Sequence, residues 1–200
     1  MRVGVLAVQG AFVEHIRVLK RLGVDVFEIR QLKDLDQRID GLVLPGGEST
    51  TQSRLLRDLG LFLPLKKRIQ EGLPVLATCA GTILLSEKID DDPTTHFQTL
   101  PVTVKRNYYG RQTGSFQKKI SFENQILDLI FIRAPLITAT HPDVNVLIRL
   151  NEGVVAVEYR HQIALNFHPE LSHQTYFHER FLKLIQARLS QDNSHHLNAH

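Results

Sequence analysis

The first 85 residues alternate short apolar segments with helical patterns, and this alternation restricts the fold more than any other feature. Residues 2–8, 24–29, 41–44 and 73–77 are typical of buried strands. Between the first two, apolar residues recur at helical spacing from Phe12 to Leu22, and Gly23 follows as a helix terminator. Strands separated by helices in this way predict a parallel sheet with helices on both faces, and ligands bind such sheets beyond the carboxyl ends of the strands.

The middle of the chain, from about 101 to 164, has a different pattern. Short apolar segments follow one another with tight turns and without intervening helices. The predicted strands are 102–104, 116–122, 129–132, 144–150, 154–159 and 162–167. We therefore expect a three-layer α/β fold with a mostly parallel, flavodoxin-like central sheet, helices on both faces, and an added antiparallel or mixed portion.

The chain length of 200 residues suits one domain. No internal repeat or linker divides it, and a last amphipathic helix is predicted from about 173 to 189. We expect a single domain over residues 1–190 and a flexible polar tail over 191–200.

The charge balance excludes several classes of protein. There are 24 basic and 21 acidic residues without a basic tract, which disfavours nucleic-acid binding. No run of 18 apolar residues is present, so no membrane span is expected. The chain starts in a strand pattern without a signal-peptide layout and has a single cysteine, so we expect a reduced, cytoplasmic protein.

Cys79, the single cysteine, lies where a predicted strand meets a predicted helix. Its neighbours Ala77, Ala80 and Gly81 are small, and a helical run continues to Leu85. A sharp strand-to-helix turn of small residues is the way a nucleophile is presented above an α/β sheet. A lone cysteine is also commonly a small buried apolar side chain, so both interpretations stay open on this segment alone.

A cysteine nucleophile needs a base, and one of the ten histidines is distinctive. His168 follows a strand pattern and precedes Pro169 and Glu170. Residues two apart in an extended segment share a side, so Glu170 can hold the imidazole and leave its other nitrogen for the thiol. A turn histidine followed by a helix-capping glutamate is the alternative. The other nine have ordinary settings in helices, loops or the tail: His15, His96, His141, His161, His173, His178, His195, His196 and His200.

The loop after the third predicted strand is the other informative stretch. Gly46 and Gly47 leave backbone N–H groups open to a ligand, and Glu48 and Ser49 follow with polar side chains. The dinucleotide pattern and the P-loop lysine are both absent, which disfavours phosphate binding. The segment favours an oxyanion donor and polar substrate contacts, with a plain structural turn as the alternative. No sequence pattern supports a metal site, and no cofactor is expected.

Together these segments resemble the triad, or class I, glutamine amidotransferases, and among them the glutaminase subunits of pyridoxal 5′-phosphate synthase. The similarity extends over about residues 2–186 in the family's order. Four blocks narrow the resemblance from amidotransferases in general to these glutaminase subunits: Arg106-Asn107, Gly110-Arg111-Gln112, Ser115-Phe116 and 131–135. The other segments that carry it are 8–11, Glu14-His15, 44–51, 78–81 and 167–171.

The resemblance implies a mechanism and a set of site residues. Cys79 would attack the side-chain amide of glutamine, with His168 as base and acid and Glu170 orienting it. The oxyanion would be held by backbone N–H groups of Gly47 and Ala80. Glutamine would be bound by residues of three loops: Gly46, Gly47, Glu48, Ser49, Arg106, Ile132 and Arg133.

The resemblance also implies a partner, a synthase subunit that uses the ammonia to assemble pyridoxal phosphate, with Gln9 and Gly10 as candidate contacts. Two other interpretations remain: another cysteine hydrolase on a related flavodoxin-like sheet, or a non-catalytic regulatory subunit.

The family usually has glycine where this chain has Ala77, and one methyl group in the elbow is expected to cost some strain.

Overall fold

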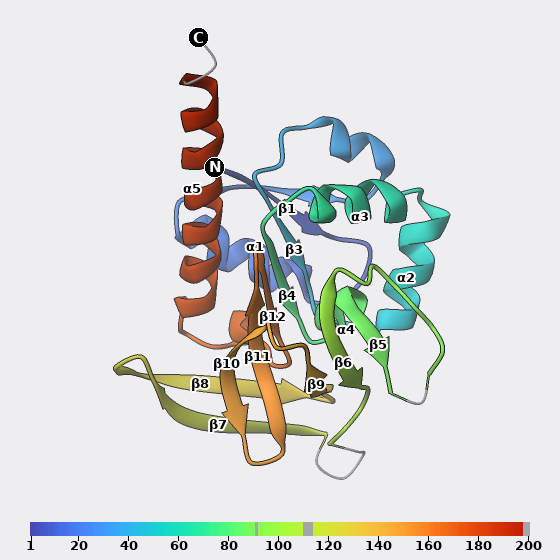
Figure 1. Cartoon of the computed structure of the whole chain (residues 1–200), viewed down its shortest axis with the longest axis vertical. Helices are drawn as coiled ribbons and strands as arrows, with labels where there is room; N and C mark the ends of the chain where they lie inside the picture. Colours follow the sequence, from blue (N-terminus) through green and yellow to red (C-terminus); the bar gives the residue numbers. More distant parts are fainter. Residues whose placement is uncertain (91, 110–113, 198–200) are drawn as a thin grey trace.

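The computed structural model describes residues 1–90, 92–109 and 114–197, with side chains in the last helix described as far as 192. A ten-stranded sheet runs through the molecule in the order β2-β1-β3-β4-β12-β11-β9-β6-β5, and β10 pairs with β11 (Figure 1). Its first five strands are mutually parallel: β2 (Asp25–Ile29), β1 (Arg2–Leu6), β3 (Gly41–Leu44), β4 (Val75–Thr78) and β12 (Gln162–Leu165).

The remaining strands of this sheet form a mixed portion. β11 lies antiparallel to β12, β10 and β9, β6 lies antiparallel to β9, and β5 returns parallel to β6. Their bounds are β5 (Ser86–Ile89), β6 (Leu100–Lys105), β9 (Leu136–Thr140), β10 (Asn145–Leu150) and β11 (Gly153–Tyr159). β12 therefore joins the parallel and the antiparallel parts.

Helices cover both faces of the parallel strands. α1 (Phe12–Arg21) and α5 (Tyr176–Leu197) pack on one face, where Leu19, Phe181 and Ile185 join a buried cluster with Val5 and Val43. On the other face the cluster includes residues of α2 (Ser49–Asp58), α3 (Phe62–Gln70) and α4 (Ala80–Leu85). The expected three-layer α/β fold with a mostly parallel sheet is confirmed.

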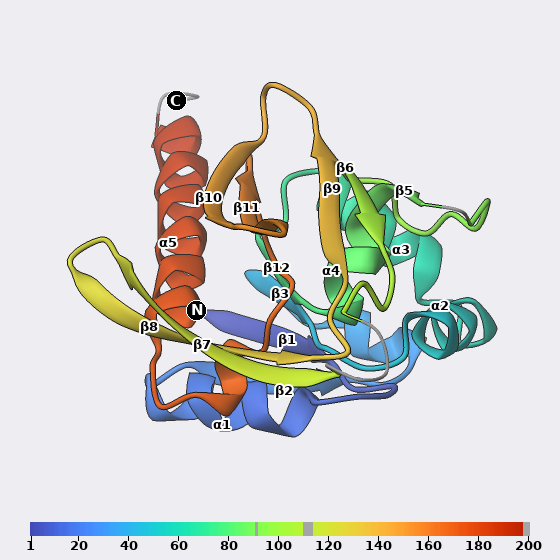
Figure 2. The same ribbon diagram turned by 90° about the horizontal axis from the view of Figure 1, so that it is seen from below.

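A separate two-stranded hairpin crosses the end of the sheet. It consists of β7 (Ser115–Phe122) and β8 (Gln125–Ile132), and both views show it running across the strands (Figures 1 and 2). Phe131 anchors it: its ring is 1% exposed, stacks 4.5 Å from Phe116 and meets Phe167 edge-on. The hairpin thus carries Ile132 and Arg133 to the carboxyl ends of the central strands.

Some elements differ from the sequence-based expectation. β5 and β9 were not predicted, because each is short and half polar and neither has a clear alternation. α5 starts at Tyr176 rather than near 173 and continues through Leu197, so the backbone is helical where a tail from Gln191 was expected. No glycine or proline interrupts residues 190–197, so nothing in this stretch stops the helix. Two short 3₁₀ segments, Leu32–Asp36 and Pro169–Leu171, complete the elements. No helix in the described ranges combines the length and apolarity needed to span a bilayer.

Candidate active site

Cys79 occupies a strained turn between β4 and α4. Its φ and ψ are 48° and −104°, a region that side-chain-bearing residues rarely adopt. Its N–H donates to the carbonyl of Leu165 at 2.8 Å, which ties the turn to β12. The next turn leaves no room for a side chain at Gly81, where a Cβ would lie 2.2 Å from the carbonyl oxygen of Leu44. The predicted nucleophile elbow is therefore present, with the thiol 6% exposed.

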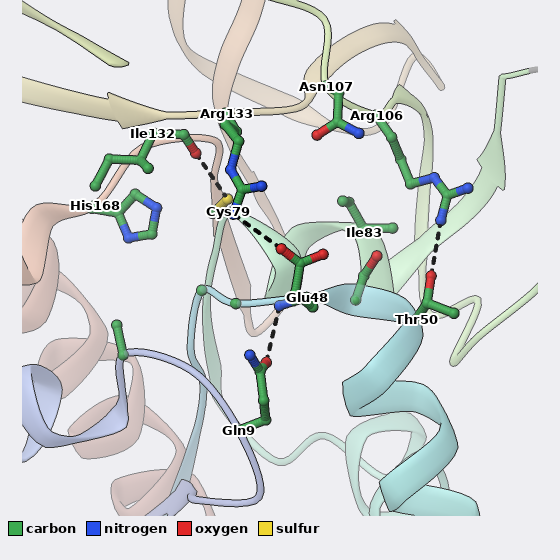
Figure 3. Close-up of a pocket in the computed structure, with 14 residues that line it drawn as sticks. Gln9, Glu48, Thr50, Cys79, Ile83, Arg106, Asn107, Ile132, Arg133 and His168 are labelled. Carbon is green, nitrogen blue, oxygen red and sulfur yellow. Dashed lines mark hydrogen bonds and ion pairs between the residues drawn. The ribbon is translucent and has the colours of Figure 1, made fainter. Parts of the chain in front are cut away.

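His168 reaches Cys79 because their strands are neighbours. β4 and β12 are parallel, and their last residues, Thr78 and Leu165, are register partners. His168 follows β12 within three residues, so its side chain lies beside the elbow (Figure 3). Its Nδ1 lies 2.7 Å from Oε1 of Glu170, which belongs to the 3₁₀ turn Pro169–Leu171. The structure thus brings the three predicted triad residues together in one buried line.

The electrostatics of this line favour a charged imidazole. Burial alone lowers the pKa of His168, but the neighbouring Cys79 and the hydrogen bond and charge of Glu170 outweigh it and raise the pKa to about 10. Burial alone raises the pKa of Glu170, but the nearby His15 and the hydrogen bond and charge of His168 bring it below its usual value. Glu170 is therefore a carboxylate at neutral pH, positioned to accept a hydrogen bond from His168.

The loop after β3 lies against the triad on one side. The N–H of Gly46 donates to Oγ1 of Thr78 at 3.0 Å, and the N–H of Glu48 donates to Oε1 of Gln9 at 2.9 Å. The carbonyl of Gly46 accepts from the N–H of Ala11 at 3.0 Å. Gly10 supports the same loop, because a Cβ there would meet the carbonyl oxygen of Gly46 at 1.9 Å. Gln9 and Gly10 therefore hold the glycine loop in position.

A pocket of about 250 Å³ opens beside Cys79 and His168 (Figure 3). All the residues predicted to bind glutamine line it: Gly46, Gly47, Glu48, Ser49, Arg106, Ile132 and Arg133. The lining also includes Gln9, and four residues that were not predicted as site residues: Ala11, Thr50, Ile83 and Asn107. Gly10, Ala80 and Glu170 lie outside this lining. Ala80 is buried at the start of α4, and Glu170 lies behind His168.

The two pocket arginines have different surroundings. Arg106 forms an ion pair with Asp92 and donates to Oγ1 of Thr50 at 3.1 Å, so its guanidinium is held on the far side of the pocket from His168 (Figure 3). Arg133 pairs with Glu48 at 3.1 Å, and both side chains are more than half exposed. Exposed pairs of this kind are weak, so Arg133 can exchange Glu48 for another anion at small cost.

Ile132 contributes its backbone to the pocket. Its carbonyl oxygen lies 3.9 Å from Sγ of Cys79, within range of a weak thiol hydrogen bond. The N–H of His168 donates to the carbonyl of Ile130 at 2.8 Å, so strand β8 is joined directly to the triad. Arg133 follows with a φ of 44°, which turns the chain at the pocket. The predicted block Gly110-Arg111-Gln112 lies outside the described residues.

Two histidines that the sequence placed in ordinary helical settings lie behind the triad. His15 on α1 has Nε2 3.3 Å from Oε2 of Glu170, and its Nδ1 lies 3.0 Å from Nε2 of His178 on α5. Both side chains are completely buried. No spacing in the sequence relates α1 and α5 to Glu170. Only the resemblance of the Glu14-His15 segment pointed to this region.

Ala77 lies in the middle of the parallel sheet. It is fully buried in β4, where its register partners are Leu44 in β3 and Ala164 in β12. Ala164 is itself small, so the methyl group of Ala77 lies next to a small side chain.

Comparison with known proteins agrees with this geometry. The model of the SNO glutamine amidotransferase family matches residues 5–187. The chain belongs to this family. Among curated members, it is 53% identical over 188 residues to "Pyridoxal 5'-phosphate synthase subunit PdxT" of Desulfitobacterium hafniense (strain DSM 10664 / DCB-2), covering 94% of each chain.

Two further relatives of this SNO amidotransferase are similar over most of its length. A protein of the same name from Methanocorpusculum labreanum is 51% identical and covers 92% of this chain and 98% of its own. The solved "Crystal structure of glutamine amidotransferase" matches with a TM-score of 0.86 at 40% identity, over 92% of this chain and 98% of the other. The fold expected from the sequence is thus shared with an experimentally determined amidotransferase.

Proposed function

We propose that this protein is the glutaminase subunit of a pyridoxal 5′-phosphate synthase and that Cys79 is its nucleophile. The observation that carries the proposal is the buried line Cys79–His168–Glu170 at the edge of a polar pocket. Cys79 sulfur attacks the side-chain amide carbon of glutamine, and ammonia leaves. Water then hydrolyses the γ-glutamyl thioester, so that glutamine and water become glutamate and ammonia.

His168 moves the protons of both steps. It accepts the thiol proton of Cys79 and donates one to the departing nitrogen, and in the second step it takes a proton from water. Glu170 does not reach the reacting atoms and acts by orienting the imidazole of His168: its Oε1 accepts a hydrogen bond from Nδ1 at 2.7 Å, which leaves Nε2 for the reacting atoms. The pKa of His168, raised to about 10, is consistent with an imidazolium that stays charged beside the sulfur.

The backbone N–H groups of Gly47 and Ala80 are the proposed oxyanion donors. On either side of Gly47, the N–H of Gly46 is already bonded to Thr78 and that of Glu48 to Gln9. Ala80 is the first residue of α4, where a backbone N–H has no acceptor within its own helix. Fixed donors of this kind stabilise the negative oxygen of the tetrahedral intermediate without reorganisation.

Glutamine binding is assigned to the polar rim of the pocket. The guanidinium of Arg106 or Arg133 is suited to the α-carboxylate, because its planar fork binds two oxygens at once. Glu48 and Ser49 offer oxygen atoms for the α-ammonium group, next to the glycine loop. Arg133 is the stronger candidate for the carboxylate, because its present partner Glu48 is exposed and easily exchanged.

Ammonia has to reach its acceptor before water protonates it, which favours a second subunit docked over the pocket. The curated relatives are named as subunits of pyridoxal 5′-phosphate synthase, and we assign this chain the same assembly. Gln9 and Gly10 are the proposed contact region, because they hold the glycine loop and can pass partner binding on to Gly47. The single cysteine, kept as a free thiol, fits a reducing cytoplasmic location.

Glutamate release from glutamine, measured with and without a pyridoxal 5′-phosphate synthase subunit, tests the proposal. Wild-type protein is expected to release glutamate when the partner is present, and Cys79→Ala is expected to release none while still binding the partner. Release by Cys79→Ala would exclude this thiol as the nucleophile. Absence of release from wild-type protein, with Cys79 inert to thiol reagents, would leave the elbow a structural turn. If Gln9→Ala left both partner affinity and partner activation unchanged, the contact assignment would be wrong.

A further inference from the structure

Two buried histidines extend the line of polar side chains beyond Glu170, although Oε2 of Glu170 contacts the first of them at ion-pair distance and not with regular hydrogen-bond geometry. His15 on α1 and His178 on α5 are both 0% exposed and belong to opposite ends of the sequence. His15 Nε2 is 3.3 Å from Oε2 of Glu170 and 3.2 Å from Oγ1 of Thr78, and His15 Nδ1 is 3.0 Å from His178 Nε2. Neither histidine lines the pocket, so neither can touch the substrate.

The proton positions on these rings follow from what their neighbours can accept. A carboxylate only accepts hydrogen bonds, and Oε1 of Glu170 is already bonded to His168, so Oε2 needs a donor. Oε2 has no hydrogen bond of regular geometry among the described residues, and Nε2 of His15 lies 3.3 Å away, so a proton on that nitrogen would supply the donor. The same nitrogen lies 3.2 Å from Oγ1 of Thr78, which accepts the N–H of Gly46 and keeps a second lone pair, so this proton would be shared between the two oxygens.

The second ring completes this assignment. A neutral His15 protonated at Nε2 has a bare Nδ1, which must accept from Nε2–H of His178. Burial lowers the pKa of His15 and lowers that of His178 to about 3, so both rings are neutral at physiological pH. Among the described residues, Nδ1 of His178 has no partner, and in this tautomer it carries only a lone pair.

We propose that His15 is a positioning residue that holds the second oxygen of Glu170, and that His178 fixes the tautomer of His15. This inference rests on the proposed glutaminase mechanism. A donor beside Oε2, in addition to the hydrogen bond from His168 at Oε1, opposes rotation of the carboxylate away from His168, and α1 and α5 fix the positions of the two rings. Loss of His15 would remove this contact, and a buried carboxylate oxygen without a polar neighbour is costly.

The first test uses the wild-type protein and is independent of activity. Nitrogen-15 NMR of the imidazole rings is expected to show His15 and His178 neutral at pH 7, with protons on Nε2 of both. A proton on Nδ1 of His15 would overturn the proposal, because Oε2 of Glu170 would then face a lone pair. This measurement tests the proton positions whether or not the protein hydrolyses glutamine.

The second test compares substitutions at position 15 by kinetics. The amide nitrogen of glutamine can take the place of histidine Nε2, so His15→Gln retains a donor to Glu170, whereas His15→Leu removes it. We expect His15→Leu to lower kcat by about tenfold or more. KM should stay within about twofold, since ground-state contacts are unchanged. His15→Gln should recover most of the lost kcat.

Two further variants separate positioning from packing. His178→Leu removes the donor to His15 and is expected to lower kcat in the same direction, whereas His178→Gln retains it. His161→Leu is the matched control: its Nε2 bonds the carbonyl of Ile69 at 2.7 Å, before β12 and away from the pocket, so kcat should not change. Equal losses in folded His15→Gln and His15→Leu, or a wild-type kcat in His15→Leu, would overturn the proposal. If His15→Leu fails to fold, the proposal is tested by comparing His178→Leu with His178→Gln and by the NMR measurement of the tautomers.

Discussion

The Cα atom of Gly46 lies directly against the imidazole ring of His168. A Cβ built on Gly46 would be 2.3 Å from Cε1 and 3.0 Å from Nδ1 of that ring. The glycine loop therefore packs against the ring of His168, the proposed general base, in addition to its proposed oxyanion role. This contact explains why a small residue is required at position 46 independently of any backbone torsion.

Gly46→Ala is expected to impair catalysis by moving His168 or the loop. Misplacement by about 1 Å is associated with a loss of roughly a hundredfold in rate. Steady-state glutaminase kinetics with the synthase subunit present would measure it. Gly72→Ala is the control: φ is +95° there and nothing lies within 4 Å, so only stability should fall, by about 1–2 kcal/mol. Equal kcat in Gly46→Ala and wild type would contradict the packing argument.

Glu170→Gln is expected to reduce kcat by about a thousandfold or more, because the imidazole loses the partner that selects its tautomer. The pKa of His168 should also fall, since the hydrogen bond and charge of Glu170 help to raise it. The pH dependence of kcat/KM would report both effects. Glu158→Gln provides a comparison, because Glu158 is a partly buried carboxylate that pairs with Arg180. A loss of less than about tenfold in Glu170→Gln would argue against a triad role for this carboxylate.

Substitution of a pocket arginine is expected to weaken glutamine binding with little effect on the free energy of unfolding. Arg133→Ala removes an exposed pair with Glu48, so the free energy of unfolding should change by less than about 1 kcal/mol. If Arg133 binds the α-carboxylate, KM for glutamine should rise by about tenfold or more, in line with loss of a charged hydrogen bond. Arg106→Ala releases Asp92 and Thr50 and serves as the comparison. A larger rise in KM for Arg106→Ala would assign the carboxylate to Arg106.

The free energy of unfolding is expected to be highest near pH 6.5. Folded His178 stays neutral down to pH about 3 while the unfolded chain takes up a proton below its ordinary value of 6.5, so acid destabilises the fold. Folded His168 keeps its proton up to pH about 10 while the unfolded chain releases it near 6.5, so alkali destabilises it too. Each group contributes a slope of about 1.4 kcal/mol per pH unit over its own window.

Urea denaturation at several pH values would measure both slopes. His178→Gln should flatten the acid side and leave the alkaline side unchanged, because glutamine does not titrate. Glu170→Gln should flatten the alkaline side, because it weakens the protonated form of His168 in the fold. An acid slope that persists unchanged in His178→Gln would show that other groups, such as His96 with its pKa lowered to about 4, dominate there.

The local features of the site could be predicted because each depends on neighbours in the chain. Small residues around Cys79 indicated the elbow, and the spacing of His168 and Glu170 indicated that the two can meet, although Glu170 lies in a 3₁₀ turn and not in the expected extended segment. Gly46 and Gly47 indicated a loop whose backbone is accessible. Strand and helix patterns of the first 85 residues were likewise local, so the parallel part of the sheet followed from them.

The sequence by itself determined which residues are candidates for the chemistry, whereas the tertiary structure decided which of them meet. β12 was expected in the antiparallel or mixed portion, and the structure pairs it antiparallel with β11 and parallel with β4; the pairing with β4 places His168 beside Cys79. His15 and His178 meet behind Glu170 because α1 and α5 cover the same face of the sheet. An apolar strand or helix pattern shows that an element buries a face, but every neighbouring apolar surface satisfies that pattern equally. Only the packing of the whole chain selects the partner.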